Sequence, residues 1–339
     1  MKNILNDAES IINLEMFGIA IPALKSRKTK TIEVLLEDRE LYQSKEEWLI
    51  TDNPYSISRT DVERIHSAEY ASSLFSEKVE DSLKEAYELI NSDGTFNRYY
   101  PEKAEVPLKE LFTQVLHTCG GTYYASRKAL ETGFCYFMGG GMHHGHKDFG
   151  HGFCPTNDIM IAAARILSEK RAEKIWIIDV DAHKGDGTAE IARDFSSVKT
   201  LSIHMADGWP LDKPEYDSAG NFNPAYFPSH IDIPIKRGEE DFYIPRLKAG
   251  LEKLENLHGE KEKPDLAIVL LGVDPYEKDE LPSTDSLKLT EEQMLERDKL
   301  IFHFFNSRRI ASAYTMAGGY GRFSWKVHYN FLHWLLKNE

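Results

Sequence analysis

Short, mostly apolar runs recur along the chain and alternate with longer amphipathic stretches. A run that stays apolar at successive positions is typical of a strand buried on both faces, as the strands of parallel sheets are. We therefore predict strands at 134–138, 175–178, 199–204, 231–235, 266–271 and 312–316. A further strand is predicted at Met16–Ile21, where Pro22 would end it.

Amphipathic stretches of helical length separate these runs. Helices are predicted at 24–36, 108–131, 156–170, 241–257, 290–305 and 323–336, with two shorter ones within 70–90. Gly133 is expected at a helix C-cap, Thr290 at an N-cap, and Asp61 at the N-cap of another short helix. Strands that alternate with helices predict an α/β fold, with a mostly parallel central sheet flanked by helices on both faces. No internal repeat or linker interrupts the pattern, so residues 1–339 are interpreted as a single domain.

Polar side chains follow four of the predicted strands. Because parallel sheets bind ligands outside the carboxyl ends of their strands, we expect these side chains to form one site. They are His143 and His144, then Asp179, Asp181 and His183, then Asp274, and finally Tyr320.

The segment Ile175–Thr188, IWIIDVDAHKGDGT, carries the strongest chemical signal. Asp179, Asp181 and His183 alternate after its apolar run, so on an extended chain they point the same way. Burying two carboxylates and an imidazole requires a compensating charge, and a divalent metal ion is the best candidate. Three protein ligands leave a tetrahedral metal with an open position for water, which is typical of a catalytic site.

The charge balance narrows the class of partner. Lys and Arg total 41 against 55 Asp and Glu, a formal net charge of −14, which argues against general binding to nucleic-acid phosphates. A cationic partner would suit this charge, although many cytosolic proteins are equally acidic.

The cysteines and the amino-terminal residues together indicate the cellular compartment in which the protein is expected. Cys119, Cys135 and Cys154 are odd in number and lack CxxC spacing, so neither a disulfide framework nor a thiolate zinc site is indicated. Acidic residues such as Asp7 and Glu9 interrupt the apolar core that a signal peptide needs. No apolar run approaches the roughly 20 residues that span a bilayer. A cytoplasmic protein without a membrane partner is expected.

Six segments, in this order along the chain, carry a family resemblance. They are PALKSR (22–27), HSAEY (66–70), GGGMHHGHKDFGHGFC (139–154), IDVDAHKGDGT (178–188), LLGVD (270–274) and AGGYG (317–321). Together they resemble the histone deacetylases of the arginase/deacetylase superfamily, and they extend over most of the chain. The resemblance implies a zinc-dependent amidohydrolase that removes an acetyl or other acyl group from the ε-amine of lysine in a protein or peptide.

The resemblance also implies which residues do the chemistry. The family's catalytic Zn2+ would be held by Asp181, His183 and Asp274. Its two active-site histidines fall on His143 and His144, their carboxylate partners on Asp179 and Asp186, and its transition-state tyrosine on Tyr320. A structural K+ or Na+ would lie beneath the zinc on Asp179, Asp181, His183, Ser202 and Ile203, largely through backbone oxygens.

In the mechanism that this resemblance implies, the metal polarises the amide carbonyl and acidifies a bound water. His144 takes a proton from that water and later helps to protonate the leaving amine. His143, held by Asp179, stays mainly electrostatic, and Tyr320 donates a hydrogen bond to the oxyanion.

Further residues match a tunnel for the acyl-lysine side chain. Gly152 and Phe153 match one wall and Trp209 the opposite wall, while Arg27 matches an arginine of an inner channel. Leu281 stands where some polyamine deacetylases have a glutamate, which favours a peptide substrate over an acetylated polyamine. Met142 shapes the foot of the pocket, and together with the additional His146 and His151 it leaves the acyl-chain length open.

Three other functions remain as alternatives. Asp181-Ala182-His183 echoes the metal motif of arginase-type ureohydrolases, but a two-metal site would need a further carboxylate where the chain has Tyr276. A non-catalytic acyl-lysine binder would be expected to have lost a ligand, a histidine or the tyrosine, and none is lost. Acetylpolyamine hydrolysis would suit the negative charge.

Overall fold

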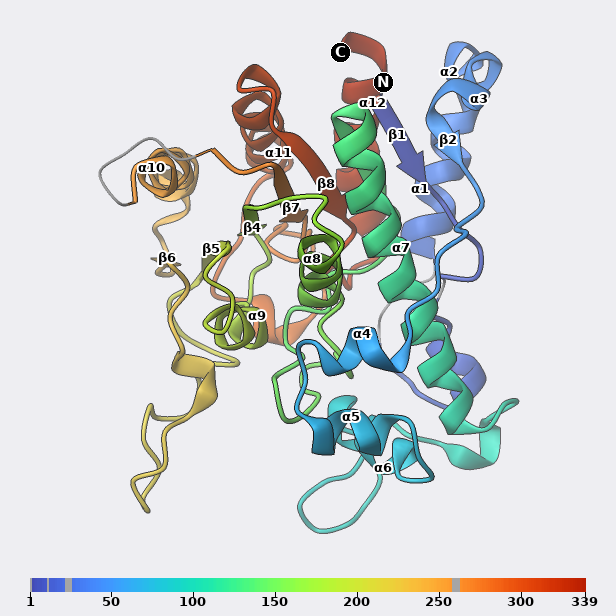
Figure 1. The fold of residues 1–339 in the computed structure, drawn as a ribbon, viewed down its shortest axis with the longest axis vertical. Coiled ribbons are helices and arrows are strands. Elements are labelled where there is room, and N and C mark those ends of the chain that lie inside the picture. Colours follow the sequence, from blue (N-terminus) through green and yellow to red (C-terminus); the bar gives the residue numbers. More distant parts are fainter. Residues whose placement is uncertain (1, 11, 22–25, 258–262) are drawn as a thin grey trace.

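A parallel β-sheet runs through the middle of the protein (Figure 1). The computed structural model describes residues 2–10, 12–21, 26–257 and 263–339. Within these residues eight strands form one sheet in the order β2-β1-β3-β8-β7-β4-β5-β6, and every neighbouring pair is parallel. The strands are β1 (Lys2–Leu5), β2 (Leu49–Ile50), β3 (Phe134–Phe137), β4 (Ile175–Asp179), β5 (Val198–Met205), β6 (Ile231–Ile235), β7 (Leu266–Leu270) and β8 (Ala311–Thr315).

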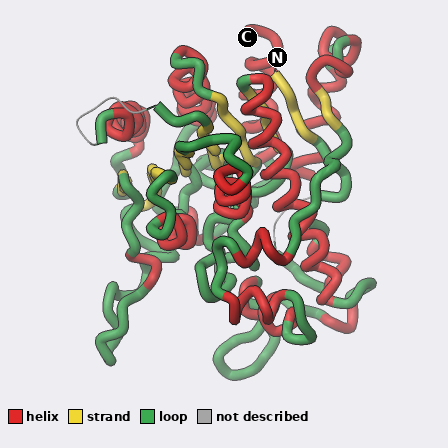
Figure 2. Tube along the Cα trace, in the orientation of Figure 1, coloured by secondary structure: helices red, strands yellow, loops and turns green. Residues whose placement is uncertain are grey.

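Helices cover both faces of the sheet (Figure 2), which confirms the predicted α/β fold. The α-helices in the described residues are α1 (Ser26–Glu37), α2 (Arg39–Gln43), α3 (Lys45–Trp48), α4 (Arg59–Glu63), α5 (Ala68–Leu74), α6 (Val79–Ala86), α7 (Leu111–Thr132), α8 (Asp158–Ser168), α9 (Asp186–Ala192), α10 (Tyr243–Glu255), α11 (Glu291–Ser307) and α12 (Ser324–Asn338). Short 3-10 helices are η1 (Leu14–Phe17), η2 (Pro101–Lys103), η3 (Leu108–Glu110), η4 (Pro224–Tyr226), η5 (Glu240–Phe242) and η6 (Pro282–Thr284).

Alternate side chains of the central strands enter two separate hydrophobic cores. In β4, Ile175 and Ile177 belong to the core that α7 and α8 cover, whereas Trp176 and Ile178 belong to the core shared with α10, α11 and α12. Successive side chains of a strand point to opposite faces, so a strand covered on both sides must be apolar throughout. The run that predicted β4 therefore has a direct physical cause.

The first part of the chain departs from the prediction. The strand predicted at Met16–Ile21 is wrong, because residues Leu14–Phe17 form η1 and Gly18 ends it in the left-handed region at φ 72°. Ile19 makes only an isolated bridge to Tyr99. Pro22 lies outside the described residues. The strand of this region is instead β1, which pairs with β3 and was missed because it begins with polar residues.

Helix caps follow local hydrogen bonding. Gly133 is the C-cap of α7 and Thr290 the N-cap of α11, as predicted. Asp61 is not the N-cap of α4. That residue is Ser58, and Asp61 occupies the third helical position, where its Oδ2 accepts a 2.9 Å hydrogen bond from the Ser58 N–H. The two form a capping box, in which acidic residues suit the third position as well as the cap itself.

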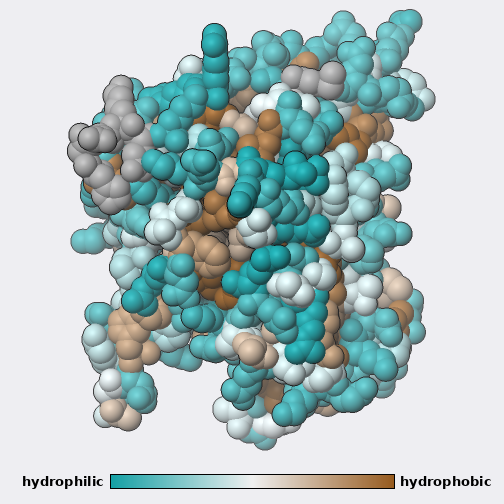
Figure 3. Space-filling view, in the orientation of Figure 1, coloured by the Kyte–Doolittle hydropathy of each residue, from teal (hydrophilic) through white to brown (hydrophobic). Residues whose placement is uncertain are grey.

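The outer surface is mostly polar on the face that Figure 3 shows. The face seen in Figure 3 is largely hydrophilic, and hydrophobic side chains reach it in small areas, one of them beside α9. None of the described helices combines the length and the apolar character needed to span a bilayer.

Candidate active site

The polar side chains predicted to form one site come from four adjacent strands. In the sheet, β3, β8, β7 and β4 are consecutive, so their carboxyl ends meet at the same edge. The loop after β3 carries His143 and His144, and the loop after β8 carries Tyr320. Because each loop follows a strand directly, the sheet sets the spacing between the groups.

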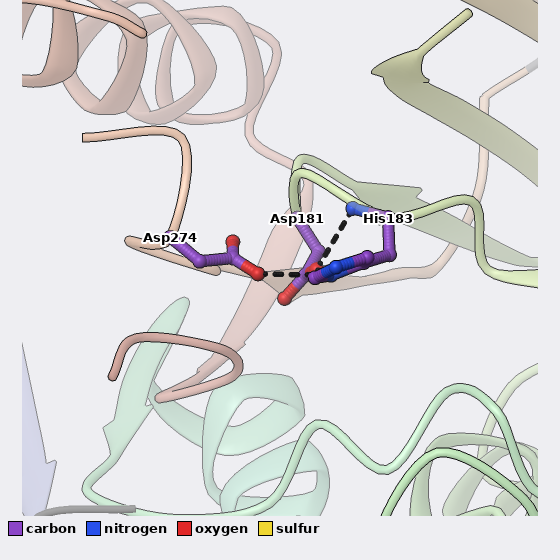
Figure 4. Close-up of side chains that lie close together, drawn as sticks. All are labelled: Asp181, His183 and Asp274. Carbon is purple, nitrogen blue, oxygen red and sulfur yellow. Dashed lines mark hydrogen bonds and ion pairs between the residues drawn. The ribbon is translucent and has the colours of Figure 1, made fainter. Parts of the chain in front are cut away.

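Asp181, His183 and Asp274 converge at this edge (Figure 4). One ligand atom from each lies within 4.8 Å of the others, and all three residues are buried. His183 Nδ1 is 3.1 Å from Asp181 Oδ1 and 3.1 Å from Asp274 Oδ2. The first two come from the loop after β4 and the third from the loop after β7, so neighbouring strands bring together residues distant in sequence.

The chemistry of this cluster fits a divalent metal ion. Burial, and then the charge of Asp181, raises the pKa of Asp274 to about 7, so the ionised form of Asp274 is disfavoured unless a further cation lies close to it. Asp274 is fully buried, and its Oδ2 makes no aligned hydrogen bond within the described residues, since its contact with His183 Nδ1 at 3.1 Å is an ion-pair contact only. Two carboxylate oxygens and one imidazole nitrogen are a common donor set for zinc.

Backbone groups hold the two carboxylates in place. Asp274 Oδ1 accepts a 2.9 Å hydrogen bond from the N–H of Ala182, and Asp181 Oδ2 accepts a 3.0 Å hydrogen bond from the N–H of Gly318. A Cβ at Gly318 would collide with Asp181 Oδ2 and lie 2.6 Å from Asp274 Oδ2. Only glycine allows the AGGYG loop to approach the cluster this closely.

His143 forms a buried pair with Asp179. Its Nδ1 lies 2.7 Å from Asp179 Oδ2, and its Nε2 lies 3.8 Å from Asp181 Oδ1. Burial disfavours the imidazolium, but the charges of Asp179 and Asp181 outweigh it and raise the pKa of His143 to about 9. In the metal-free protein the imidazolium form of this histidine is therefore favoured at neutral pH.

His144 forms a second pair with Asp186, the first residue of α9. Its Nδ1 lies 2.7 Å from Asp186 Oδ1, and its ring centroid is 3.9 Å from that of His143. Burial, and then the positive charge of His143, lowers the pKa of His144 to about 3. A neutral imidazole that donates from Nδ1 keeps Nε2 free as a proton acceptor.

Tyr320 is held at the other side of the cluster. Its backbone N–H donates a 2.7 Å hydrogen bond to Asp279 Oδ2, and its ring centroid lies 6.3 Å from that of Phe153. Burial and the nearby Asp181 and Asp274 keep the pKa of Tyr320 well above its usual value. The phenol therefore remains a hydrogen-bond donor.

A pocket of about 300 Å³ leads to these groups. The predicted tunnel residues Gly152, Phe153, Trp209 and Leu281 line it together with His144, His183 and Tyr320. The Trp209 ring centroid is 4.5 Å from that of His144. The loop 206–229 thus brings an aromatic side chain to the pocket.

A second cavity of about 170 Å³ adjoins the first and shares Gly152, Phe153 and Tyr320 with it. Arg27 and Met142 both line it. Arg27 Nη1 donates hydrogen bonds of 2.6 Å to the Ala317 carbonyl and 3.1 Å to the Gly319 carbonyl. Arg27 therefore lies next to the AGGYG loop, where the inner channel was expected.

Three of the five residues predicted to hold a monovalent ion lie on adjacent strands, and the other two, Asp181 and His183, follow in the loop after β4. Asp179 at the end of β4 is in register with Ser202 of β5, and Ile203 follows. Asp179 Oδ1 accepts a 3.1 Å hydrogen bond from the Asp181 N–H, and Ser202 Oγ lies 3.0 Å from His204 Nδ1.

Several neighbours of the site carry no recognisable sequence signal. Glu88 and Arg98 line the mouth of the outer pocket, with Glu88 Oε2 3.5 Å from Arg98 Nη2. Both have positive φ, 55° and 53°, as does Phe153 at 67°. Such backbone strain is typical of functional sites, but a positive φ at a residue other than glycine cannot be predicted from its residue type.

Comparison with known proteins gives one family and a set of distant relatives. The family model described as "Histone deacetylase domain" matches residues 22–331. An uncharacterized protein of Picosynechococcus is 31% identical over 62% of this chain and 63% of its own length. Histone deacetylase 2 of Arabidopsis thaliana is 26% identical over 81% of this chain and 64% of its length, and the acetoin utilization protein AcuC of Staphylococcus aureus is 29% identical over 56% and 46%. The chain thus spans less than two thirds of each of these relatives.

Proposed function

This chain belongs to the histone deacetylase family, and on that premise we propose that it is a zinc-dependent amidohydrolase acting on acyl-lysine in proteins or peptides. The observation that carries the proposal is the buried Asp181, His183 and Asp274 cluster, in which no aligned hydrogen bond within the described residues reaches Asp274 Oδ2. The full length, residues 1–339, is proposed as one catalytic domain.

A zinc ion held by these three residues would polarise the acyl carbonyl and lower the pKa of the attacking water. His144 accepts a proton from that water at Nε2, because its Nδ1 is engaged by Asp186. The same nitrogen then delivers the proton to the departing ε-amine. His143 keeps its charge beside Asp179 and acts electrostatically.

Tyr320 supplies the remaining stabilisation. Its raised pKa keeps the hydroxyl protonated, so it can donate to the oxyanion that develops on the acyl oxygen. Asp279 fixes the backbone of this residue and so the position of its ring.

A structural K+ or Na+ is proposed beneath the zinc. Its ligands would be oxygens of Asp179, Asp181, His183, Ser202 and Ile203. The register of Asp179 with Ser202 supports this proposal, because it brings both residues to the same level of the sheet.

The outer pocket suits the aliphatic part of an acyl-lysine, with Phe153 and Trp209 as its walls and Leu281 near its rim. The acyl group itself would extend towards Met142 and Arg27 in the adjoining cavity.

The mouth favours a peptide over an acetylated polyamine. Arg98 places a cation beside the Phe153 ring, 5.6 Å from its centroid, where it opposes a polycation. The loop that carries Glu88 and Arg98 also exposes Ile90 and Phe96, which offer contact area to residues flanking an acyl-lysine. The polyamine remains the second candidate, because the net charge of −14 and Glu88 both attract amines.

The cellular location is proposed to be the cytoplasm. All three cysteines, Cys119, Cys135 and Cys154, are buried and free, which suits a reducing compartment.

A parallel substrate assay tests the proposal. Purified protein is incubated with acetyl-lysine peptides, longer acyl-lysine peptides, N-acetylpolyamines and arginine, each with and without a chelator. Chelator-sensitive deacylation of a lysine peptide supports the proposal. If N-acetylpolyamines are turned over faster than lysine peptides, the proposed substrate changes to a polyamine. Urea release from arginine would overturn the proposed function.

A further inference from the structure

Asp186 serves two imidazoles, one on each carboxylate oxygen. Its Oδ1 lies 2.7 Å from His144 Nδ1 and accepts a 2.9 Å hydrogen bond from the Gly187 N–H. Its Oδ2 makes no aligned hydrogen bond within the described residues, and its close neighbours are His146 Nε2 at 3.2 Å, an ion-pair contact, and His151 Nε2 at 3.9 Å. The proposed catalytic pair His144–Asp186 is thus continued by a third residue on the far side of the carboxylate.

His146 is tightly fixed in this position. Its Nδ1 lies 2.7 Å from Glu190 Oε2, which is one turn after Asp186 on α9. Its ring stacks on Phe149 with centroids 4.4 Å apart and planes 14° apart. Its backbone oxygen lies 2.8 Å from His66 Nδ1, and the residue is 1% exposed. Neither the ring nor its backbone is free to turn away from Asp186.

We infer that His146 is a positioning residue for the proposed hydrolysis. As a cation shared between the carboxylates of Asp186 and Glu190, it holds Asp186 in place, and Asp186 in turn holds the ring of His144. The inference rests on the proposed function for the reaction that it serves. The row of groups Glu190, His146, Asp186 and His144 leads from the protein surface to the proposed proton acceptor.

The charges of this row explain why a cation is needed beyond Asp186. Asp186 is fully buried, and a buried carboxylate requires a cationic or hydrogen-bonding partner. His144 can act as a base only while it is neutral, so it cannot supply that charge. His146 can, because a carboxylate faces each of its ring nitrogens.

The acid–base properties agree with this geometry. Burial disfavours the charged ring, but the adjacent carboxylates of Asp186 and Glu190 outweigh it and raise the pKa of His146 to about 9. His151, the other imidazole near Asp186, has a lowered pKa because of burial and is neutral. The chain therefore assigns the positive charge to one of the two additional histidines that follow the His pair.

Three single variants test the inference. His146→Gln removes the cation, His146→Lys keeps a cation, and Lys147→Gln is the matched control, because Lys147 Nζ pairs with Asp194 at 2.6 Å on the surface. On an acetyl-lysine peptide we expect His146→Gln to lower kcat about tenfold, the lower end for a residue that supports an active group. We expect KM to stay within about twofold, since substrate binding is untouched. His146→Lys should recover part of the loss, and Lys147→Gln should match the wild type.

Unchanged kcat in His146→Gln would overturn the inference, as would a His146→Lys enzyme that is as slow as His146→Gln. If His146→Gln fails to fold, Glu190→Gln takes its place, because it removes only the outer partner of His146. A lower kcat in that variant supports the inference, and an unchanged kcat contradicts it.

A readout without turnover separates this inference from the proposed function. In the metal-free wild type, side-chain ¹⁵N NMR of His146 should show both ring nitrogens protonated at pH 7. A singly protonated ring would overturn the inference whatever the enzyme acts on. A doubly protonated ring in a protein without deacylase activity would leave the charge assignment intact and reject only the proposed function.

Discussion

The carboxylate of Asp274 accepts a 2.9 Å hydrogen bond from the backbone N–H of Ala182, the residue between Asp181 and His183. The third side chain of the metal cluster is therefore tied to the loop that carries the other two. One oxygen of Asp274 is used for this bond, and the other faces His183 Nδ1 at 3.1 Å. The cluster is thus preorganised by the backbone.

Gly318→Ala should weaken zinc binding while largely preserving the fold. The added Cβ would collide with Asp181 Oδ2 and crowd Asp274 Oδ2, so both carboxylates would have to move. We expect zinc affinity to fall by about 10–100-fold, the range for residues that support metal ligands. Competition with a chromogenic chelator measures it. Gly250→Ala in α10, whose Cβ would meet the flexible end of Ile233, is the control. Equal affinity in the two variants would contradict the prediction.

Tyr320→Phe should lower kcat by about 100-fold or more, the usual effect of losing one oxyanion donor. Zinc content and KM should stay close to wild type, because the hydroxyl contributes only as the oxyanion forms. Steady-state kinetics and metal analysis check both points. Tyr314→Phe is a matched control, since the Tyr314 hydroxyl is buried and makes no hydrogen bond within the part of the chain that the structure describes. Full activity in Tyr320→Phe would remove this residue from the mechanism.

Arg297→Met should destabilise the protein strongly. The fully buried Arg297 donates from Nη1 to the Val180 carbonyl at 3.1 Å and the Gly272 carbonyl at 2.8 Å, and from Nε to Asp298 at 2.8 Å. Its loss leaves Asp298 buried and unpaired, which typically costs about 3–5 kcal/mol. Urea unfolding measures the change. Arg308→Met, which breaks a more exposed pair with Glu255, should cost about 1 kcal/mol or less. Similar losses in both would refute the role of Arg297.

Stability should fall at mildly acidic pH because of His66. Burial lowers the pKa of His66 from 6.5 to about 4 in the folded state, where Nδ1 faces the His146 carbonyl at 2.8 Å. A lowered folded pKa means that the unfolded chain binds the proton first. The contribution of His66 to the free energy of unfolding is therefore complete above pH 6.5. It is lost as the pH falls towards 4, and the total loss is about 3 kcal/mol.

Urea unfolding at several pH values between 7.5 and 4.5 gives the free energy of unfolding at each pH and tests this effect. His66→Gln should be less stable at neutral pH but should lose less stability over the range than the wild type. Parallel pH profiles for the two proteins would exclude His66 as the cause.

The fold was predictable where burial is complete. The apolar run Ile175–Ile178 predicts β4 because both faces of that strand are covered. In contrast, β1 begins with Lys2 and Asn3, and Asn3 Nδ2 donates to Thr132 Oγ1 at 2.9 Å, so polar residues can occupy this strand. The false strand at Met16–Ile21 arose because an apolar run says nothing about the turn that Gly18 makes.

The candidate site was predictable to the extent that strand ends meet. Asp181, His183 and Asp274 lie together because β4 and β7 are neighbours, and each follows its strand closely. In contrast, the hydrogen bond between Asp279 and Tyr320 joins residues that are far apart in the sequence, and no sequence pattern predicts it. The family resemblance could assign roles to matching positions, but such tertiary contacts need the structure.

The most direct test of the metal assignment is a zinc titration of the metal-free protein, monitored by hydrolysis of an acetyl-lysine peptide. We predict no hydrolysis without metal, and activity that rises linearly and stops at one zinc per chain. Asp274→Asn should require far more zinc to reach its endpoint, because one of the three ligands is lost. Hydrolysis that persists without metal, or that needs two zinc ions per chain, would contradict the one-metal site of Asp181, His183 and Asp274.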